Sequence, residues 1–263
     1  MYFLPNSLTG LCFIILRLLF ANQSNLEEPF TAYPCNYHVY EGHQLCFNIA
    51  TRQSLWVGWS LSKTEATTKA ISRATRFYPD PFFPDDTASD SDYKGSGLDR
   101  GHLTPAADMR YSAQAMKDCF YYSNISPQHP SVNRGIWADL ESLTRKWATQ
   151  FGIAYITTGP LFTDKAPRTI GVHKIPVPDA FYKAILIYPG KDFSESSMPP
   201  VQAIAFIIPN SPTKEPLKTY ACTIDDVEKN TGFNFFPGLP DIEESIIESS
   251  LDLTAWNLED TSN

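Results

Sequence analysis

The order of hydrophobic and polar residues predicts a protein with several β-strands. Residues 54–61 alternate apolar with small or polar side chains, which is typical of a strand with two different faces. Other short segments rich in Ile, Val, Tyr and Phe have the length of buried strands: 120–124, 153–158, 181–188 and 201–208. The chain therefore contains enough strands for a sizeable sheet.

The clearest helix is predicted over residues 134–150. Its apolar residues fall within an arc of roughly 60° at 100° per residue, so they form one buried stripe: Ile136, Leu140, Leu143 and Trp147. Glu141 and Arg145 are four residues apart and lie side by side on its flank. Asn133 lies at its start, so an amide, a carboxylate and a guanidinium come close together.

A second helix and two irregular segments complete the pattern. Residues 223–231 predict a helix that ends at Gly232. Residues 77–97 form a long loop rich in Pro, Asp, Ser and Gly, and loops of this length are often functional. We expect a linker over 22–34, a single domain over 35–240, and an appended C-terminal tail over 241–263.

Composition agrees with one compact, loop-rich domain. The 263 residues are 43% hydrophobic, which suffices for a sizeable core, and the 21 prolines favour strands and loops. The formal net charge is −8, and the tail 241–263 carries seven acidic residues with no Lys or Arg. Residues 1–240 are therefore nearly neutral, which excludes a broad basic surface but leaves room for local phosphate binding.

The N-terminus contains an apolar run over residues 8–21 that has the length of a signal-peptide core. We expect a signal peptide over 1–21, a secreted or periplasmic protein, and no stable membrane association once the signal is removed. An uncleaved anchor and an ordinary N-terminal segment are the alternatives. A mitochondrial presequence is disfavoured, because Arg17 is the only basic residue before Arg52.

Five cysteines become four if Cys12 is removed with the signal. An even number in an exported chain predicts two disulfides. Cys35 and Cys46 flank a short polar turn, which favours a local bridge, and Cys119–Cys222 then follows by elimination. Four reduced, buried thiols are the alternative.

Residues 98–104 read Leu-Asp-Arg-Gly-His-Leu-Thr and carry the strongest chemical signal. Asn124-Ile125-Ser126-Pro127-Gln128 follows, and then Asn133 to Glu141 on the predicted helix. A histidine, an amide, a carboxylate and several arginines suit a phosphodiesterase that uses one metal ion. A strand with His102, a strand ending at Asn124, and a helix opening at Asn133 make a strand–strand–helix unit.

On these residues the chain resembles the DNA/RNA non-specific endonucleases. The likeness runs from about Cys46 to Phe236, and it includes Asp92 to Leu103, Asn124 to Glu141, Thr158 to Phe162 and Thr231 to Phe236. It implies an α+β fold of the ββα-metal type, with a central antiparallel sheet flanked by helices. It also implies an endonuclease that hydrolyses DNA and RNA.

The resemblance assigns a role to each candidate residue. His102 would be the general base that activates water, and Asn124 would fix the strand beside it. Asn133 would be the direct protein ligand of Mg²⁺, which Mn²⁺ can replace, and Glu141 would hold metal-bound water. The arginines that would stabilise the phosphate are Arg76 and Arg145, with a partly structural role for Arg100.

Several alternatives stay open at this stage. Asn133 fits a helix cap, and Glu141 with Arg145 fits an ordinary surface ion pair. The whole chain fits a phosphodiesterase for small nucleotides or a non-catalytic, nuclease-like binding module. DNA and RNA are the expected partners, and the family likeness also raises the prospect of a homodimer.

Overall fold

The computed structural model describes residues 33–189 and 201–258, together with Leu26, Glu28, Pro29 and Thr31. The expected signal peptide lies outside the described residues. Within the described part, no helix is both long and apolar enough to span a bilayer.

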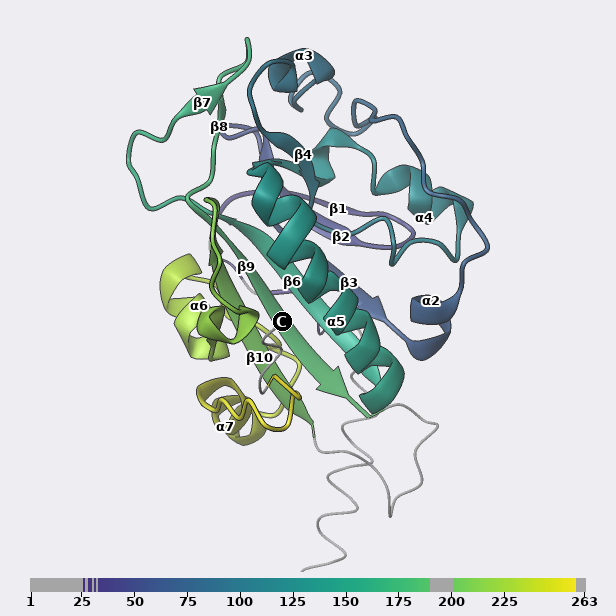
Figure 1. The fold of residues 1–263 in the computed structure, drawn as a ribbon, viewed down its shortest axis with the longest axis vertical. Helices are drawn as coiled ribbons and strands as arrows, with labels where there is room; N and C mark the ends of the chain where they lie inside the picture. The colour runs from purple at the N-terminus through teal and green to yellow at the C-terminus, as the bar shows by residue number, and fades with distance from the viewer. Residues whose placement is uncertain (1–25, 27, 30, 32, 190–200, 259–263) are drawn as a thin grey trace, which may run out of the picture.

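One antiparallel sheet of seven strands forms the centre of the molecule (Figure 1). Its strands, in spatial order, are β1 (Asn36–Val39), β2 (Gln44–Asn48), β3 (Gln53–Leu61), β6 (Ile153–Leu161), β9 (Ala180–Tyr188), β10 (Gln202–Pro209) and β11 (Ala221–Cys222). Four of these strands were predicted almost in full from their apolar and aromatic residues. The expected α+β class with a central antiparallel sheet is confirmed.

Both faces of this sheet are buried, each under different helices. On β9, the side chains of Phe181 and Ile185 pack in the cluster that includes α5 (Trp137–Phe151). The alternate residues Tyr182 and Leu186 pack in the second cluster, with α6 (Ile224–Thr231) and α7 (Asp241–Ser249). Figure 1 shows α5 crossing the sheet, with α6 and α7 beside β10.

The predicted helix over 134–150 is two elements rather than one. A π-helical turn, η2 (Val132–Ile136), precedes α5, with non-helical backbone at Gly135. Leu140 and Trp147 are buried as expected, but Leu143 is only partly buried because the stripe is centred on Trp137, Thr144 and Ala148. π-Helical turns occur often at functional sites, and this one carries Asn133.

A two-stranded sheet, β4 (Asp99–His102) with β5 (Ile125–Gln128), leads into η2 and α5. The predicted strand over 120–124 is wrong: Tyr122–Asn124 is a 3₁₀ turn, η1, and β5 starts at Ile125. The turn forms because the Asn124 side chain binds backbone groups of other residues. The remaining elements are α2 (Lys63–Thr67), α3 (Asp90–Tyr93) inside the long loop, α4 (Ala113–Asp118), β7 (Thr169–Ile170), β8 (Ile175–Pro176) and η3 (Leu217–Tyr220).

The four cysteines that the structure describes form one disulfide. Cys35 bonds to Cys46 and links the start of β1 to β2, as predicted. The predicted Cys119–Cys222 bridge is wrong, because both thiols are free. Cys119 is buried in the cluster under α5, whereas Cys222 packs with the cluster under α6, so the sheet separates them.

Residues 241–258 pack against the domain, which differs from the expected appendage. After α7 the chain turns back, and Trp256 is 1% exposed in the core cluster that contains α5. The Trp147 indole donates a hydrogen bond to the Trp256 carbonyl at 3.1 Å, and the two rings meet edge to face. The family-like domain is therefore completed by residues beyond 240.

Candidate active site

His102 ends β4 and is almost completely buried, with 8% of its surface exposed. Its ring packs between Phe77, at 5.3 Å, and Phe120, at 4.6 Å between ring centroids. Its Nε2 atom has no hydrogen-bond partner in the described part of the chain. The imidazole is therefore held rigidly while one ring nitrogen is left for another partner.

The surroundings of His102 keep it neutral. Burial, and after it the positive charges of Arg73 and Arg100, lower the pKa of His102 from 6.5 to about 3. A neutral imidazole has a free lone pair, which a general base needs. The ring is thus in its basic form throughout the physiological pH range.

Asn124 fixes the backbone that follows His102. Its side-chain oxygen accepts the Thr104 N–H at 2.9 Å, and its amide donates to the Thr104 carbonyl and to the Cys119 carbonyl. Its own carbonyl accepts the Leu103 N–H at 2.9 Å. The residue is fully buried, so these bonds account for its side chain and tie β4 to the turn before β5.

Asn133 lies in η2, opposite the start of β4. Its amide nitrogen donates to the Asp99 carboxylate at 2.9 Å, and Arg134 donates to the same oxygen at 2.8 Å. Because the nitrogen is occupied, the amide oxygen is the end of this side chain that is offered to other partners. Asp99 therefore orients Asn133 as well as β4.

Glu141 lies on α5, two turns after Asn133, and faces the sheet with charged neighbours around it. Burial raises the pKa of Glu141, while Lys183 is the strongest of the positive charges that oppose this rise. Burial likewise lowers the pKa of Lys183, opposed by Glu141 and Asp108. The two groups stabilise each other's charged forms.

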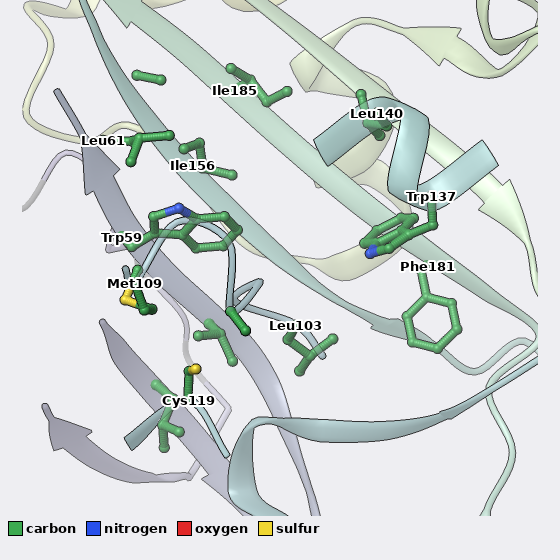
Figure 2. Close-up of a cluster of buried hydrophobic side chains, with 14 of the residues drawn as sticks. Trp59, Leu61, Leu103, Met109, Cys119, Trp137, Leu140, Ile156, Phe181 and Ile185 are labelled. Carbon is green, nitrogen blue, oxygen red and sulfur yellow. The ribbon is translucent and has the colours of Figure 1, made fainter. Parts of the chain in front are cut away.

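Lys183 is a functional candidate that the sequence interpretation missed. It is 1% exposed on β9, and its Nζ lies 4.8 Å from the Trp59 ring and 4.7 Å from the Trp137 ring. Figure 2 shows these two indoles among the core side chains on one face of the sheet. The sequence signal for Lys183 was a single charged residue in an otherwise apolar strand. On its face of the strand it lies between Phe181 and Ile185.

Arg145 binds a buried carboxylate. Its guanidinium lies 2.8 Å from Asp108, whose side chain is 1% exposed and also accepts the Trp59 indole N–H at 3.0 Å. Arg145 also lowers the pKa of Glu141. The two charges therefore act on each other, as their spacing along the helix predicts. Asp108 holds the arginine beside the strand that carries Trp59.

Arg100 lies next to His102, whereas Arg76 lies beside the Tyr78 ring. Arg100 pairs with Asp90 and lies 4.6 Å over the Phe77 ring, next to His102. Arg76 is exposed and lies 5.8 Å from the Tyr78 ring. Among the described residues, the charges that act most on His102 and Glu141 do not include Arg76.

Arg73 instead reaches the site. Its guanidinium lies 5.4 Å over the Phe120 ring, and its charge acts on both His102 and Glu141. Arg73 and Arg76 are three residues apart in the same loop, so the pattern of the sequence could not separate them. The structure makes Arg73 the better candidate for a phosphate-binding arginine.

The sequence profile of the DNA/RNA non-specific endonucleases matches residues 22–242. This chain belongs to that family. Its relatives include nuclease EXOG of Xenopus laevis, 35% identical over 212 residues, which cover 76% of this chain and 58% of that protein. Human endonuclease G is 31% identical over 211 residues, which cover 76% and 69% of the two chains.

The structural comparison supports the same fold for this endonuclease-family chain. The crystal structure of an EndoG/EndoGI complex matches it with a TM-score of 0.71 at 24% identity, over 80% of this chain and 89% of that one. The chain spans about three fifths of the length of the EXOG relatives it matches. The expected ββα-metal fold is confirmed.

These relatives overturn the expectation of export. EXOG of Xenopus laevis, human endonuclease G and nuclease 1 of Schizosaccharomyces pombe are all named mitochondrial. The length of the apolar N-terminal run fits a signal-peptide core, but length alone does not identify a secreted or periplasmic protein. The scarcity of basic residues, with Arg17 alone before Arg52, disfavoured a mitochondrial presequence. That feature does not outweigh the similarity to mitochondrial relatives.

The donor set of this endonuclease-family site fits a hard divalent cation. The family is metal-dependent, and hard cations prefer oxygen ligands. The amide oxygen of Asn133 is left available by the bond from its nitrogen to Asp99. Glu141 adds a carboxylate from α5, which directly follows η2, and Lys183 favours its charged form.

Proposed function

We propose that this protein is an endonuclease that hydrolyses phosphodiester bonds in both DNA and RNA, with His102 as its general base. One observation carries the proposal: a buried, neutral histidine with an unpartnered Nε2, in the same ββα unit as Asn133 and Glu141. Family membership supports the nuclease class, and the site supports the assignment of roles.

In the proposed reaction, Nε2 of His102 takes a proton from water as the water oxygen bonds to phosphorus. The bond from phosphorus to the leaving sugar oxygen breaks, and that oxygen takes up a proton from solvent water, while His102 later returns its proton to solvent. Phe77 and Phe120 keep the imidazole in position, and Asn124 fixes the backbone behind it. Proton transfer by a positioned base contributes about 10²–10⁴-fold to a rate.

The negative charge that grows on the phosphate needs positive partners. A bound Mg²⁺, or Mn²⁺ in its place, would neutralise charge on the phosphate oxygens and lower the pKa of its own waters. Asn133 would hold it directly and Glu141 through water. Arg73 and Arg145 lie where guanidinium groups can stabilise the same charge, and Arg100 keeps the loop in place. None of these contacts recognises a base, which accounts for action on both DNA and RNA.

The test is cleavage of plasmid DNA and of RNA by the purified chain with Mg²⁺. His102→Ala should lose about 100-fold or more of the activity while keeping the wild-type circular dichroism spectrum. His38→Ala, which alters a histidine outside the site, should keep full activity. Wild-type cleavage by His102→Ala would refute the role of His102, and cleavage of a dinucleotide but not of polymers would favour a small-nucleotide phosphodiesterase.

By likeness to its relatives, we also propose that the protein works in mitochondria. Subcellular fractionation with a compartment marker tests this, and recovery outside mitochondria would contradict it. A homodimer stays a prediction, which sedimentation of the full chain would decide.

A further inference from the structure

A group of acidic side chains lies far from His102, on the other face of the central sheet. Asp225 and Glu228 are on α6, one turn apart, and Glu248 is on α7. One carboxylate oxygen from each lies within 4.8 Å of the other two. Two helices thus bring three negative groups to one point.

The group has no counter-charge among its strongest neighbours. The charged side chains that act on Glu248 are Glu228, Glu244 and Asp225, all acidic. Glu248 also lies in the last turn of α7, where the helix dipole disfavours a negative charge. Burial and these neighbours raise the pKa of Glu248 to about 9.

Glu248 is also incompletely satisfied. Only 5% of its surface is exposed, and its Oε1 has no hydrogen-bond partner within the described part of the chain. Glu228, in contrast, accepts the Phe235 N–H at 2.8 Å. A buried carboxylate oxygen without a donor, beside two more carboxylates, lacks a cation or a proton.

We propose that Asp225, Glu228 and Glu248 bind a Ca²⁺ ion that fastens α7 to α6. Ca²⁺ binds oxygen at about 2.3–2.6 Å, so oxygens on opposite sides of the ion are about 4.6–5.2 Å apart. Mg²⁺ demands near-ideal octahedral geometry and usually keeps several of its waters, so a set of three carboxylates suits Ca²⁺ better. Asp225 is exposed, which lets water complete the coordination.

The consequence lies in the C-terminal segment. Residues after α7 include Trp256, which packs against Trp147 of α5 on the opposite side of the sheet. An ion between α6 and α7 would hold the start of this segment, and its removal would loosen the path to Trp256. The ion would therefore stabilise the fold without taking part in hydrolysis.

The experiment is isothermal titration calorimetry with CaCl₂ on the metal-free full chain carrying Asn133→Ala. That background removes the proposed ligand of the active-site metal, so the two sites are kept apart. We expect one Ca²⁺ per chain, a rise in melting temperature with Ca²⁺ that exceeds the rise with Mg²⁺, and release of protons on binding.

Glu248→Gln in the same background should weaken Ca²⁺ binding about tenfold or more, which corresponds to ~1.4 kcal/mol. It keeps the shape of a protonated glutamate, so the variant should fold. Glu243→Gln, a matched loss of one charge on α7, should bind as the background does. No binding heat, or unchanged affinity in Glu248→Gln, would overturn the proposal and leave a shared proton as the occupant of the cluster.

Discussion

At the level of single residues, the site contains charged side chains at buried positions that are usually occupied by apolar ones. Lys183 has the place of a core residue on β9, between the rings of Trp59 and Trp137. Its charge acts on Asp108 and on Glu141 of α5, and burial raises the pKa of both carboxyl groups. A buried charge is tolerated only when it is paired, so these groups are interdependent.

Lys183→Met should therefore lower both stability and activity. Loss of one partner leaves buried carboxylates uncompensated, which costs about 3–5 kcal/mol in free energy of unfolding. The pKa of Glu141 should rise further, so the acid limb of the pH–rate profile should move to higher pH. Urea denaturation and a pH–rate profile measure both effects.

The control for Lys183 is a double variant. Lys183→Met with Glu141→Gln removes both charges, so stability should be partly regained while activity stays low. If Lys183→Met alone matched the wild type in stability and rate, the proposed coupling would be wrong.

A second residue-scale prediction concerns His43, which lies outside the site. Burial lowers the pKa of His43 to about 3, and its ring stacks on Tyr40 at 4.7 Å. Because the unfolded chain binds a proton near pH 6.5 and the native one does not, this residue's contribution to stability is present above pH 6.5. It is lost as the pH falls towards 3.

From pH 7 to pH 5 this loss is about 2 kcal/mol in free energy of unfolding. His43→Leu cannot titrate, so its stability relative to the wild type should improve by that amount over the same interval. Urea denaturation of both proteins at the two pH values measures the difference. An equal pH response in the two proteins would show that His43 does not carry this effect.

At the scale of elements, the ββα unit requires close contact between β4 and β5. A methyl group at Gly101 would lie 2.4 Å from the Gln128 side-chain oxygen and 2.6 Å from its Cβ. Gly101 directly precedes His102, so a shift there would move the imidazole. The glycine therefore helps to fix the position of His102, the proposed base.

Gly101→Ala should cost about 1–3 kcal/mol in free energy of unfolding and should lower the rate of cleavage. Adding Gln128→Gly removes both the side-chain oxygen and Cβ from the contact and should recover part of the rate. Thermal unfolding and plasmid cleavage measure the outcome, and a rate unaffected by Gly101→Ala would show that β4 accommodates the methyl group.

Elements with a strong local signal were predicted from the sequence. The strand at 53–61 follows its alternation, and α6 runs from Ile224 to Thr231 with Thr223 and Gly232 as its caps, as these residues predict. The 3₁₀ turn at Asn124 was missed because its stabilising bonds run to Thr104 and Cys119, five or more residues away. The motif at residues 98–104 and the apolar stripe of α5 were enough to predict His102 and the helix. Arg73 and Lys183 can be assigned to the site only from tertiary contacts.

At the scale of the whole molecule, the acidic C-terminal segment is part of the core. Its charge suggested a solvated tail, but Trp256 and Leu258 are buried. Apolar residues within an acidic stretch outweighed its net charge, because burial of one indole contributes about as much as several surface charges.

Trp256→Ala should lower the free energy of unfolding by about 3–5 kcal/mol, the range for removal of a buried aromatic ring. Leu251→Ala, at a residue that is 38% exposed, should change it by far less. Chemical denaturation measures both variants, and similar values for the two would mean that Trp256 contributes little.

The contact between Trp147 and Trp256 also constrains the order of assembly. The two residues are 109 positions apart, and His102, Asn133 and Glu141 all precede the second one. A chain that emerges from the ribosome has the side chains of the proposed active site well before it has the indole that closes the core over α5. The packing of that helix can be finished only after Trp256 has been made, which delays the completed form of the proposed site until then.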